Sequence, residues 1–213
     1  MRYGVFLTIQ RAIMARKKKW SDSWTKKAKE QGYAARSVFK LEELEKRFAP
    51  LRGMKRFVDL GCAPGSWSHY ITRHNHKASV VGIDFKEVNS YPGTFYQSRI
   101  EDMDPQIVRT DLGGIVDMVL SDMAPNTTGN RLTDHVRQLE LADKALDFAV
   151  SVLRPGGRFV VKVFDGEDIQ DYYMRVKKHF STVKRLRPKA TRNTSVEFFM
   201  LGLDFKKNPS SQN

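Results

Sequence analysis

The sequence predicts an α/β fold in which a mostly parallel, seven-stranded sheet is covered by helices on both faces. From residue 56 onward, short apolar segments typical of buried strands alternate with longer segments of helical periodicity. Turn signals such as Arg154-Pro-Gly-Gly157 separate these segments. Strand–helix alternation of this kind indicates one parallel sheet with helices packed on either side.

The region before the first strand is expected to form a basic arm and two helices. Residues 22–31 are predicted to be helical, and Gly32 is expected to end that helix. Ser37 can cap a second helix, whose apolar face would be formed by Val38, Leu41 and Leu44.

The remaining elements follow in alternating order. Strands are predicted over residues 56–60, 78–83, 95–97, 115–120, 158–164, 183–187 and 196–203. Helices are predicted after Pro64-Gly65 and over residues 105–110, 134–153 and 168–180. The last two strands could form an antiparallel pair at the edge of the sheet. Asp84 and Asp122 follow two strands, and ligands of such sheets bind at these carboxyl ends.

The length of 213 residues supports one sizeable core. We expect a single domain over residues 20–205, a basic N-terminal arm over 1–19 and a disordered tail over 206–213. The apolar segment of residues 3–9 is far shorter than the ~20 residues that a membrane-spanning helix requires. No membrane association is therefore expected.

The first residues leave the start of translation and the cellular address open. The spacing of Arg2, Arg11 and Arg16, with no acid before Asp22, is compatible with a mitochondrial presequence. A simpler interpretation is that translation starts at Met14 rather than Met1. The single cysteine excludes an intramolecular disulfide and a cysteine metal cage, so the cytoplasm is the expected compartment and the mitochondrion the alternative.

The net charge of +13 is concentrated in two segments. Residues 1–47 and residues 175–192 each carry a net charge of +8, and the rest of the chain is slightly acidic. A near-neutral body with two basic segments is typical of a protein that binds a polyanion such as RNA, although a solvated basic surface would look the same. The five histidines lack metal-ligand spacing, and no metal is expected.

A glycine loop follows the first predicted strand and precedes a helix. The loop Gly61-Cys-Ala-Pro-Gly65 lets backbone approach a ligand closely, but it lacks the G-x-G-x-x-G pattern of a dinucleotide site. Asp84, at the end of the second strand, can bind the ribose hydroxyls of a nucleoside cofactor, including S-adenosyl-L-methionine. Asp59 could hold the loop or face an ammonium group of the cofactor.

Charged residues in predicted buried strands need a partner or a function. Lys162 lies inside the apolar segment 159–164, where a purely structural lysine is hard to explain. Asp122 could equally cap a loop. Lys40 taken alone looks like a solvated helix lysine, and for Glu197 taken alone a structural role is favoured.

Six short segments follow one another in a fixed order within residues 20–204. They are Ser37-Val-Phe-Lys40-Leu, Asp59-Leu-Gly-Cys-Ala-Pro-Gly-Ser-Trp67-Ser, Ser121-Asp-Met-Ala-Pro-Asn126, Pro155-Gly-Gly157, Val160-Val-Lys-Val-Phe-Asp-Gly166 and Ser195-Val-Glu197. In this order and spacing they resemble the motifs of the FtsJ/RrmJ family of 2′-O-ribose RNA methyltransferases. The resemblance implies a Rossmann-like S-adenosylmethionine-dependent methyltransferase fold.

The branch that the chain resembles most is the bacterial one, which methylates a uridine ribose in the A-loop of large-subunit ribosomal RNA. Other branches act on tRNA or mitochondrial rRNA. The resemblance assigns the family's catalytic Lys–Asp–Lys–Glu tetrad to Lys40, Asp122, Lys162 and Glu197. It assigns cofactor binding to Gly65, Trp67, Asp84 and Asp122, to which the loop adds Gly61 and Asp59 as candidates.

One position departs from the family pattern. The family has an acid after the third strand that binds the adenine amino group, whereas this chain has Arg99. Glu101, Asp102 or a backbone carbonyl could take over that contact.

The groups of the tetrad suggest roles in transfer to a weakly nucleophilic ribose hydroxyl. A cationic Lys162 would stabilise the developing alkoxide, whereas a neutral Lys162 would accept its proton. Lys40 would add positive charge or aim the substrate, and Glu197 would pair with a lysine. RNA phosphates are expected to contact Lys17, Lys18, Lys19, Lys184, Arg185, Arg187 and Arg192.

Two other functions compete with a monomeric methyltransferase. A non-catalytic rRNA-binding assembly factor could use the same fold, but it would not need Lys162 buried beside Asp122. A nicotinamide oxidoreductase is disfavoured by Ala63 and Pro64 in the glycine loop.

Overall fold

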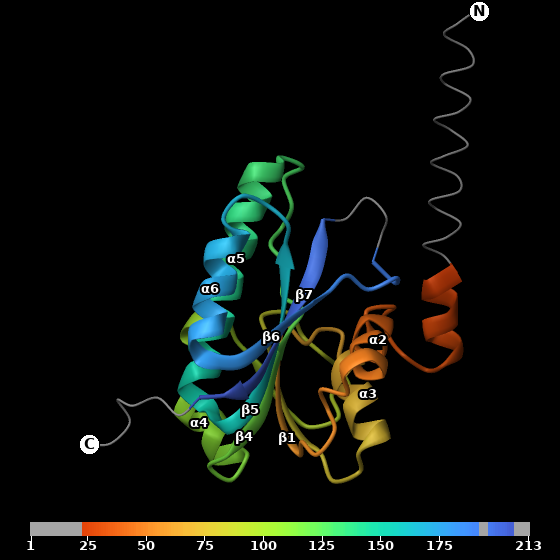
Figure 1. Ribbon diagram of the computed structural model, residues 1–213. Coiled ribbons are helices and arrows are strands. Elements are labelled where there is room, and N and C mark those ends of the chain that lie inside the picture. Colours follow the sequence, from red (N-terminus) through yellow and green to blue (C-terminus); the bar gives the residue numbers. More distant parts are fainter. Residues whose placement is uncertain (1–22, 192–195, 207–213) are drawn as a thin grey trace, which may run out of the picture.

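The computed structural model describes residues 23–191 and 196–206 (Figure 1). The predicted basic arm, with Lys17, Lys18 and Lys19, lies outside the described residues. The same holds for Arg192 and for residues 207–213 of the predicted tail.

Within the described residues, seven strands form one sheet in the order β3-β2-β1-β4-β5-β7-β6. All neighbouring strands are parallel except β7, which is antiparallel to both β5 and β6. The predicted α/β fold with a mostly parallel sheet is therefore confirmed. The strands are β1 (Arg56–Leu60), β2 (Ser79–Asp84), β3 (Thr94–Gln97), β4 (Val116–Ser121), β5 (Leu153–Phe164), β6 (Phe180–Leu186) and β7 (Glu197–Phe205).

Helices cover both faces of the sheet (Figure 1). The helices α4 (Pro105–Asp111), α5 (Arg131–Val152) and α6 (Ile169–His179) lie on one face. The helices α2 (Val38–Phe48) and α3 (Ser66–His74) lie on the other, where a further helical segment spans residues 23–30. A short 3-10 helix, η1 (Ile100–Asp102), was not predicted. None of the described helices is long and apolar enough to cross a membrane.

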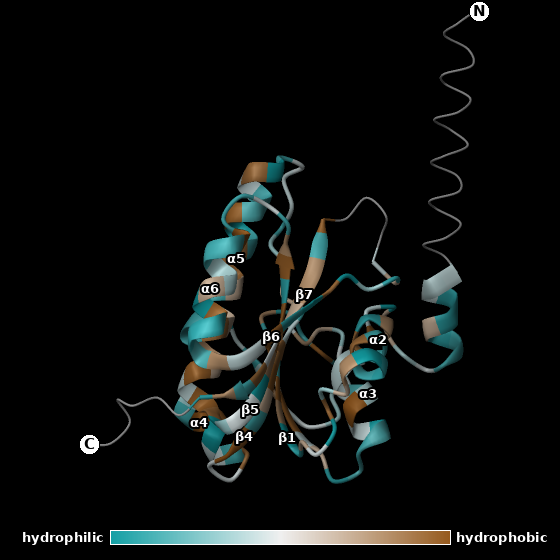
Figure 2. Cartoon of the chain, viewed as in Figure 1, coloured by the Kyte–Doolittle hydropathy of each residue, from teal (hydrophilic) through white to brown (hydrophobic). Residues whose placement is uncertain are grey.

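Two hydrophobic cores result from the two-residue period of the strands. Val58 and Val119 pack into the core under α4, α5 and α6. Phe57 and Met118, their neighbours along the chain, pack into the core under α2 and α3. Figure 2 shows apolar residues along the strands and hydrophilic residues on the helices that cover them.

Strand β7 occupies a position that local patterns do not indicate. The predicted antiparallel pairing of the last two strands is observed, but only β6 lies at the edge of the sheet. β7 is inserted between β5 and β6, and Lys162 of β5 pairs with Phe199 of β7. This insertion brings the start of β7 to the carboxyl end of β5.

The beginning of β5 corrects the predicted turn over residues 154–157. These residues lie within β5, and the register with β4 shifts between Val116 and Met118. Gly156 takes a φ of +76°, a conformation that glycine adopts without strain. A buried carboxylate, Asp117, secures this irregular segment by accepting a hydrogen bond from Arg154 Nε at 2.5 Å.

Ser37 immediately precedes α2 as predicted, but its side chain makes no capping hydrogen bond. Its carbonyl oxygen instead accepts a hydrogen bond of 2.8 Å from Trp67 Nε1. The start of α2 is therefore attached to α3, which fixes the position of Lys40 one turn later.

Candidate active site

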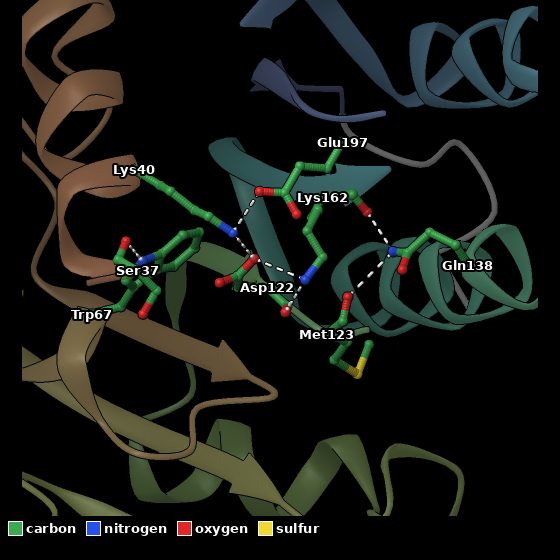
Figure 3. A network of polar contacts seen from close by, with 8 residues as sticks. All are labelled: Ser37, Lys40, Trp67, Asp122, Met123, Gln138, Lys162 and Glu197. Carbon is green, nitrogen blue, oxygen red and sulfur yellow. Dashed lines mark hydrogen bonds and ion pairs between the residues drawn. The ribbon is translucent and has the colours of Figure 1, made fainter. Parts of the chain in front are cut away.

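Four charged side chains from distant parts of the chain meet at the carboxyl edge of the sheet (Figure 3). Lys40 extends from α2, Asp122 follows β4, Lys162 lies near the end of β5 and Glu197 begins β7. The structure thus brings together all four residues that the resemblance assigns to catalysis.

Lys162 is the most deeply buried cation of this cluster, with 5% of its side chain exposed. Its Nζ donates to the backbone oxygen of Asp122 at 2.6 Å and lies 3.0 Å from Asp122 Oδ1. Because an ammonium group has three donors, one donor is left to point toward a substrate oxygen. A lysine at this depth requires such partners, since burying an unpaired charge is unfavourable.

Lys40 connects the two carboxylates of the cluster. Its Nζ lies 2.9 Å from Glu197 Oε1 and 3.5 Å from Asp122 Oδ1, and it also lies over the ring of Phe199. Burial alone would lower the pKa of Lys40, but the charges of Asp122 and Glu197 outweigh it and raise the pKa. Lys40 is therefore a permanent cation at neutral pH.

Asp122 is held as a carboxylate by both lysines. Burial would raise the pKa of Asp122, but the nearby charges of Lys162 and Lys40 outweigh it and hold the pKa below its ordinary value. The cluster therefore consists of two cations that share one ionised acid, with Glu197 as the second acid.

A pocket of about 460 Å³ adjoins the cluster at Asp122. It is lined by residues from the ends of β1, β2 and β4, from residues 98–101 and from α5. Of the predicted cofactor residues, Gly61, Asp84 and Asp122 line this pocket. This is the position at which parallel α/β sheets bind ligands.

The glycine loop is shaped by close contacts at Gly61. This residue has a φ of +72°, and a Cβ placed there would lie 2.6 Å from Met123 Cγ. Only glycine fits this position without strain. Asp84 anchors the loop, because its Oδ2 accepts a hydrogen bond from the backbone N–H of Ala63 and its Oδ1 accepts one from Lys86.

Three predicted cofactor residues do not line the pocket. Gly65 is the residue before α3 and has a φ of +93°. Trp67 is 3% exposed and packs against Phe199. Asp59 is 1% exposed and accepts a hydrogen bond of 2.6 Å from Ser68 Oγ. Desolvation by burial raises the pKa of Asp59 to about 7.

Arg99 does line the pocket, together with the exposed ring of Phe85. The guanidinium group of Arg99 lies 5.7 Å from the centre of that ring. Glu101 also lines the pocket and pairs with Lys144, whereas Asp102 is not among the lining residues. Of the two acids considered for the adenine contact, Glu101 is therefore the one at the pocket.

Gln138 is a polar contact of the cluster that the sequence reasoning missed. It lies in α5 and is 1% exposed. The signal was present, since Gln138 falls on the helix face that also carries Ala142 and Ala145, both buried. A single amide on such a face indicates a specific hydrogen-bond partner.

The predicted RNA-contacting residues within the described range are exposed. Lys184 and Arg185 lie in β6, and Arg187 follows it. Arg185 lies over the ring of Tyr173 and donates to Gln170. Among the described residues, no group of three or more His, Cys, Asp or Glu side chains could hold a metal ion.

Residues 33–205 match the family model described as FtsJ-like methyltransferase. The chain belongs to this family. The match covers well over half of the chain, and the family resemblance of the six motifs is confirmed. This FtsJ-like protein is accordingly a methyltransferase, and the binding of a methyl donor follows from its family.

Relatives of this FtsJ-like methyltransferase include two bacterial proteins named ribosomal RNA large subunit methyltransferase E. The protein of Novosphingobium aromaticivorans is 42% identical over 191 residues, which cover 89% of this chain and 86% of the relative. The protein of Brachyspira hyodysenteriae is 42% identical over 194 residues, which cover 89% of this chain and 98% of the relative.

A similar architecture is found in a solved structure. The crystal structure of a Plasmodium falciparum protein assigned as a ribosomal RNA methyltransferase matches with a TM-score of 0.73 and 27% identity. The match covers 81% of this chain and 98% of that protein.

Proposed function

We propose that this FtsJ-like methyltransferase transfers a methyl group from S-adenosyl-L-methionine to a ribose 2′-hydroxyl of RNA. The proposed substrate is a uridine in the A-loop of large-subunit ribosomal RNA. The observation that carries the proposal is the ion cluster of Lys40, Asp122, Lys162 and Glu197, which adjoins a ligand pocket at Asp122.

The pocket suits a nucleoside-type methyl donor. Backbone N–H groups of Ala63 and Lys86 fix the carboxylate of Asp84, and its remaining lone pairs can accept hydrogen bonds from ribose hydroxyls. The exposed ring of Phe85 offers a surface on which a purine can stack. The family's acid at the adenine position is replaced by Arg99, so this contact is expected to differ from the family pattern.

When bound, S-adenosyl-L-methionine supplies an electrophilic methyl group, and the product sulfide leaves as the new O–C bond forms. Lys162 is proposed to stabilise the negative charge that develops on the 2′-oxygen as its proton passes to water. Its two hydrogen bonds to Asp122 aim the third donor outward. Because these donors are already oriented, little reorganisation is needed during the reaction.

Lys40 and Glu197 are proposed to orient the substrate. Lys40 brings a second cation to within 3.5 Å of Asp122 and is itself held by Glu197 at 2.9 Å. A phosphate or ribose of the target strand is proposed to approach Lys40 at the carboxyl edge of the sheet. The ion pair with Glu197 restricts the lysine to one direction.

RNA is proposed to approach along the basic segment of residues 175–192 and the N-terminal residues. Lys184, Arg185 and Arg187 are exposed there, and Lys17, Lys18, Lys19 and Arg192 add charge in the sequence. The names of the relatives support ribosomal RNA as the substrate class. We propose a single catalytic domain over residues 20–205 that acts as a monomer in the cytoplasm.

The proposal is tested by methyl transfer from radiolabelled S-adenosyl-L-methionine. Three substrates are compared: large ribosomal subunits that lack the modification, free ribosomal RNA and bulk tRNA, with the labelled nucleotide mapped in each. The expected result is label on a ribose 2′-oxygen in the A-loop of the large ribosomal RNA. Label on tRNA would overturn the substrate but keep the reaction, and label on a base would overturn the reaction.

A further inference from the structure

Gln138 joins the two backbone segments that carry Asp122 and Lys162. Its Nε2 donates to the backbone oxygen of Lys162 at 2.8 Å and to that of Met123 at 3.2 Å. Figure 3 shows this amide reaching from α5 to both segments on the side of the cluster opposite Lys40. One side chain therefore connects the end of β4 to the end of β5.

The connection lies where the pairing between β4 and β5 ends. The last pair of this ladder is Ser121 with Val161, so Asp122 and Lys162 come one residue beyond it. On the other side, β5 continues to pair with β7 as far as Phe164. Lys162 is thus still held by strand pairing with β7, whereas Asp122 lies beyond the last residue pair between β4 and β5. At this point the two hydrogen bonds from Gln138 connect the segments that carry Asp122 and Lys162.

The same segment also forms a wall of the cofactor pocket. Met123 lines the pocket, and its side chain lies so close to Gly61 that no Cβ would fit between them. A shift of Met123 would therefore move both Asp122 and the contact with the glycine loop. Gln138 therefore binds the residue next to Asp122, the point at which the ion cluster and the pocket meet.

A glutamine at this position is unfavourable unless its donors are used. Gln138 is almost fully buried, and within the described residues its Oε1 has no hydrogen-bond partner. Burying an unpaired polar atom destabilises a fold relative to an apolar side chain of similar size. A residue with a packing role alone would be apolar, as its neighbour Leu139 is.

We propose that Gln138 is a positioning residue of the methyl transfer. Its amide holds the Asp122–Met123 backbone at the distance from Lys162 that aims the lysine at the substrate. The inference rests on the proposed function of Lys162 and Asp122. It assigns to α5 a role in catalysis in addition to its role in the core.

The first test replaces Gln138 by methionine, which has a similar shape and no N–H donors. With RNA and cofactor both saturating, kcat of Q138M should fall about 10- to 100-fold, because misplacement of reacting groups by about 1 Å has effects of this size. The thermal midpoint and the fraction of folded protein are measured in parallel. The matched control is Q106M on α4, whose exposed side chain lies away from the site.

A second variant separates positioning from packing. Q138E keeps the shape, but an ionised glutamate has no donor for the two carbonyl oxygens, whereas its protonated form has one. The ratio of Q138E activity to wild-type activity should therefore rise as the pH falls. The ratio is taken as kcat per folded molecule, because a buried ionised glutamate also destabilises the fold as the pH rises. A substitution that disturbed only packing would leave this ratio independent of pH.

Contrary results are readily recognised. Wild-type kcat in folded Q138M overturns the inference, as does a pH-independent ratio for Q138E. Both results leave the proposed function intact as long as the wild-type protein methylates RNA. A wild-type protein that binds the cofactor but methylates no RNA overturns the proposed function, and the positioning role with it.

Discussion

Two acids, one in β1 and one directly after the neighbouring strand β4, have pKa values shifted in opposite directions. Asp59 lies in β1 with a hydroxyl group, Ser68 Oγ, at 2.6 Å, and burial raises its pKa to about 7. Asp122 follows β4 with two ammonium groups, Lys162 Nζ and Lys40 Nζ, at 3.0 and 3.5 Å. Burial acts on Asp122 in the same direction, but the two cations reverse its effect and lower the pKa.

The difference shows that cations, more than depth alone, determine the charge of acids at this edge. The exposed fraction is 1% for Asp59, and that of the Asp122 side chain is 17%, so solvent is limited at both. The hydrogen bond from Ser68 favours the ionised form of Asp59, but burial outweighs it, so the ionised form remains unfavourable. Asp122 therefore stays ionised at the place where the proposed chemistry uses its charge. The ionised form of Asp59, beneath the glycine loop, instead lowers the stability of the fold.

Removal of the nearer cation, Lys162, should affect both catalysis and the charge of Asp122. Lys162→Ala should lower methyl transfer by about 10³-fold or more, because a buried donor to the developing oxyanion is lost. The same substitution should raise the pKa of Asp122, because burial would then be opposed by Lys40 without Lys162. Isothermal titration should show that S-adenosyl-L-methionine still binds.

The matched control is Lys77→Ala, an exposed lysine just before β2 at the opposite end of the sheet. It should retain wild-type turnover. Turnover retained by Lys162→Ala itself would refute the catalytic role.

The second test removes the carboxylate charge of Asp59, which burial makes unfavourable. The folded-state pKa of Asp59 is raised from about 3.8 to about 7, so its burial destabilises the protein increasingly as the pH rises through this interval. Asp59→Asn should therefore stabilise the fold at pH 8 by up to roughly 3–4 kcal/mol, and the gain should shrink as the pH falls toward 4. Urea denaturation at several pH values measures this gain.

The same variant distinguishes the two roles considered for Asp59. If Asp59 only supports the glycine loop through Ser68, Asp59→Asn should bind the cofactor with nearly unchanged affinity, because asparagine keeps an acceptor for the Ser68 hydroxyl. If the carboxylate of Asp59 instead faces the cofactor's ammonium group, the variant should lose much of its cofactor affinity. Asp147→Asn, at an exposed position of α5, is the control and should show no pH-dependent gain of this kind.

The third test adds an acid to the pocket. Arg99→Asp restores the residue type of the family, and a charge-assisted hydrogen bond to the adenine amino group should tighten binding of S-adenosyl-L-methionine about 3- to 10-fold. Calorimetric titration measures the change. A cofactor analogue without the 6-amino group should show no gain, and an equal gain with that analogue would contradict the predicted contact.

The smallest expected effect concerns a charge outside the cluster. If Lys184 contacts a phosphate, Lys184→Gln should reduce the slope of log affinity for RNA against log salt by about 0.7–0.9. Lys184 is exposed in β6, so loss of its charge should leave kcat at saturating RNA unchanged. Lys77→Gln should leave this slope unchanged. An equal decrease of the slope in Lys77→Gln would indicate that RNA is attracted non-specifically by any surface charge.

The sequence was sufficient to predict elements whose cause is local. The strand over residues 56–60 has the predicted bounds, and Gly32 follows the helical segment 23–30 with a φ of +72°. Apolar runs and a glycine carry these signals within a few residues.

Features that depend on distant partners were not predictable in this way. The insertion of β7 between β5 and β6 depends on pairing between strands that lie far apart in the sequence. The predicted turn at 154–157 lies within the bounds of β5, where Arg154 binds Asp117, a residue of β4 that is distant in the sequence. The four residues of the ion cluster were assigned by resemblance, since Lys40 and Glu197 have no local signal. Gln138 could have been found as a polar residue on a buried helix face.

The placement of β7 has a consequence for the nascent chain. Among the strands of the described residues, β7 is the last to be synthesised, yet it fills the gap between two strands that are made before it. Until residues 197–205 leave the ribosome, one edge of β5 is open, and Val160, Val161 and Val163 there are apolar. An open apolar edge is a template for pairing with other chains. Because Glu197 arrives with the same strand, an incompletely synthesised chain is prone to aggregate and lacks one residue of the ion cluster.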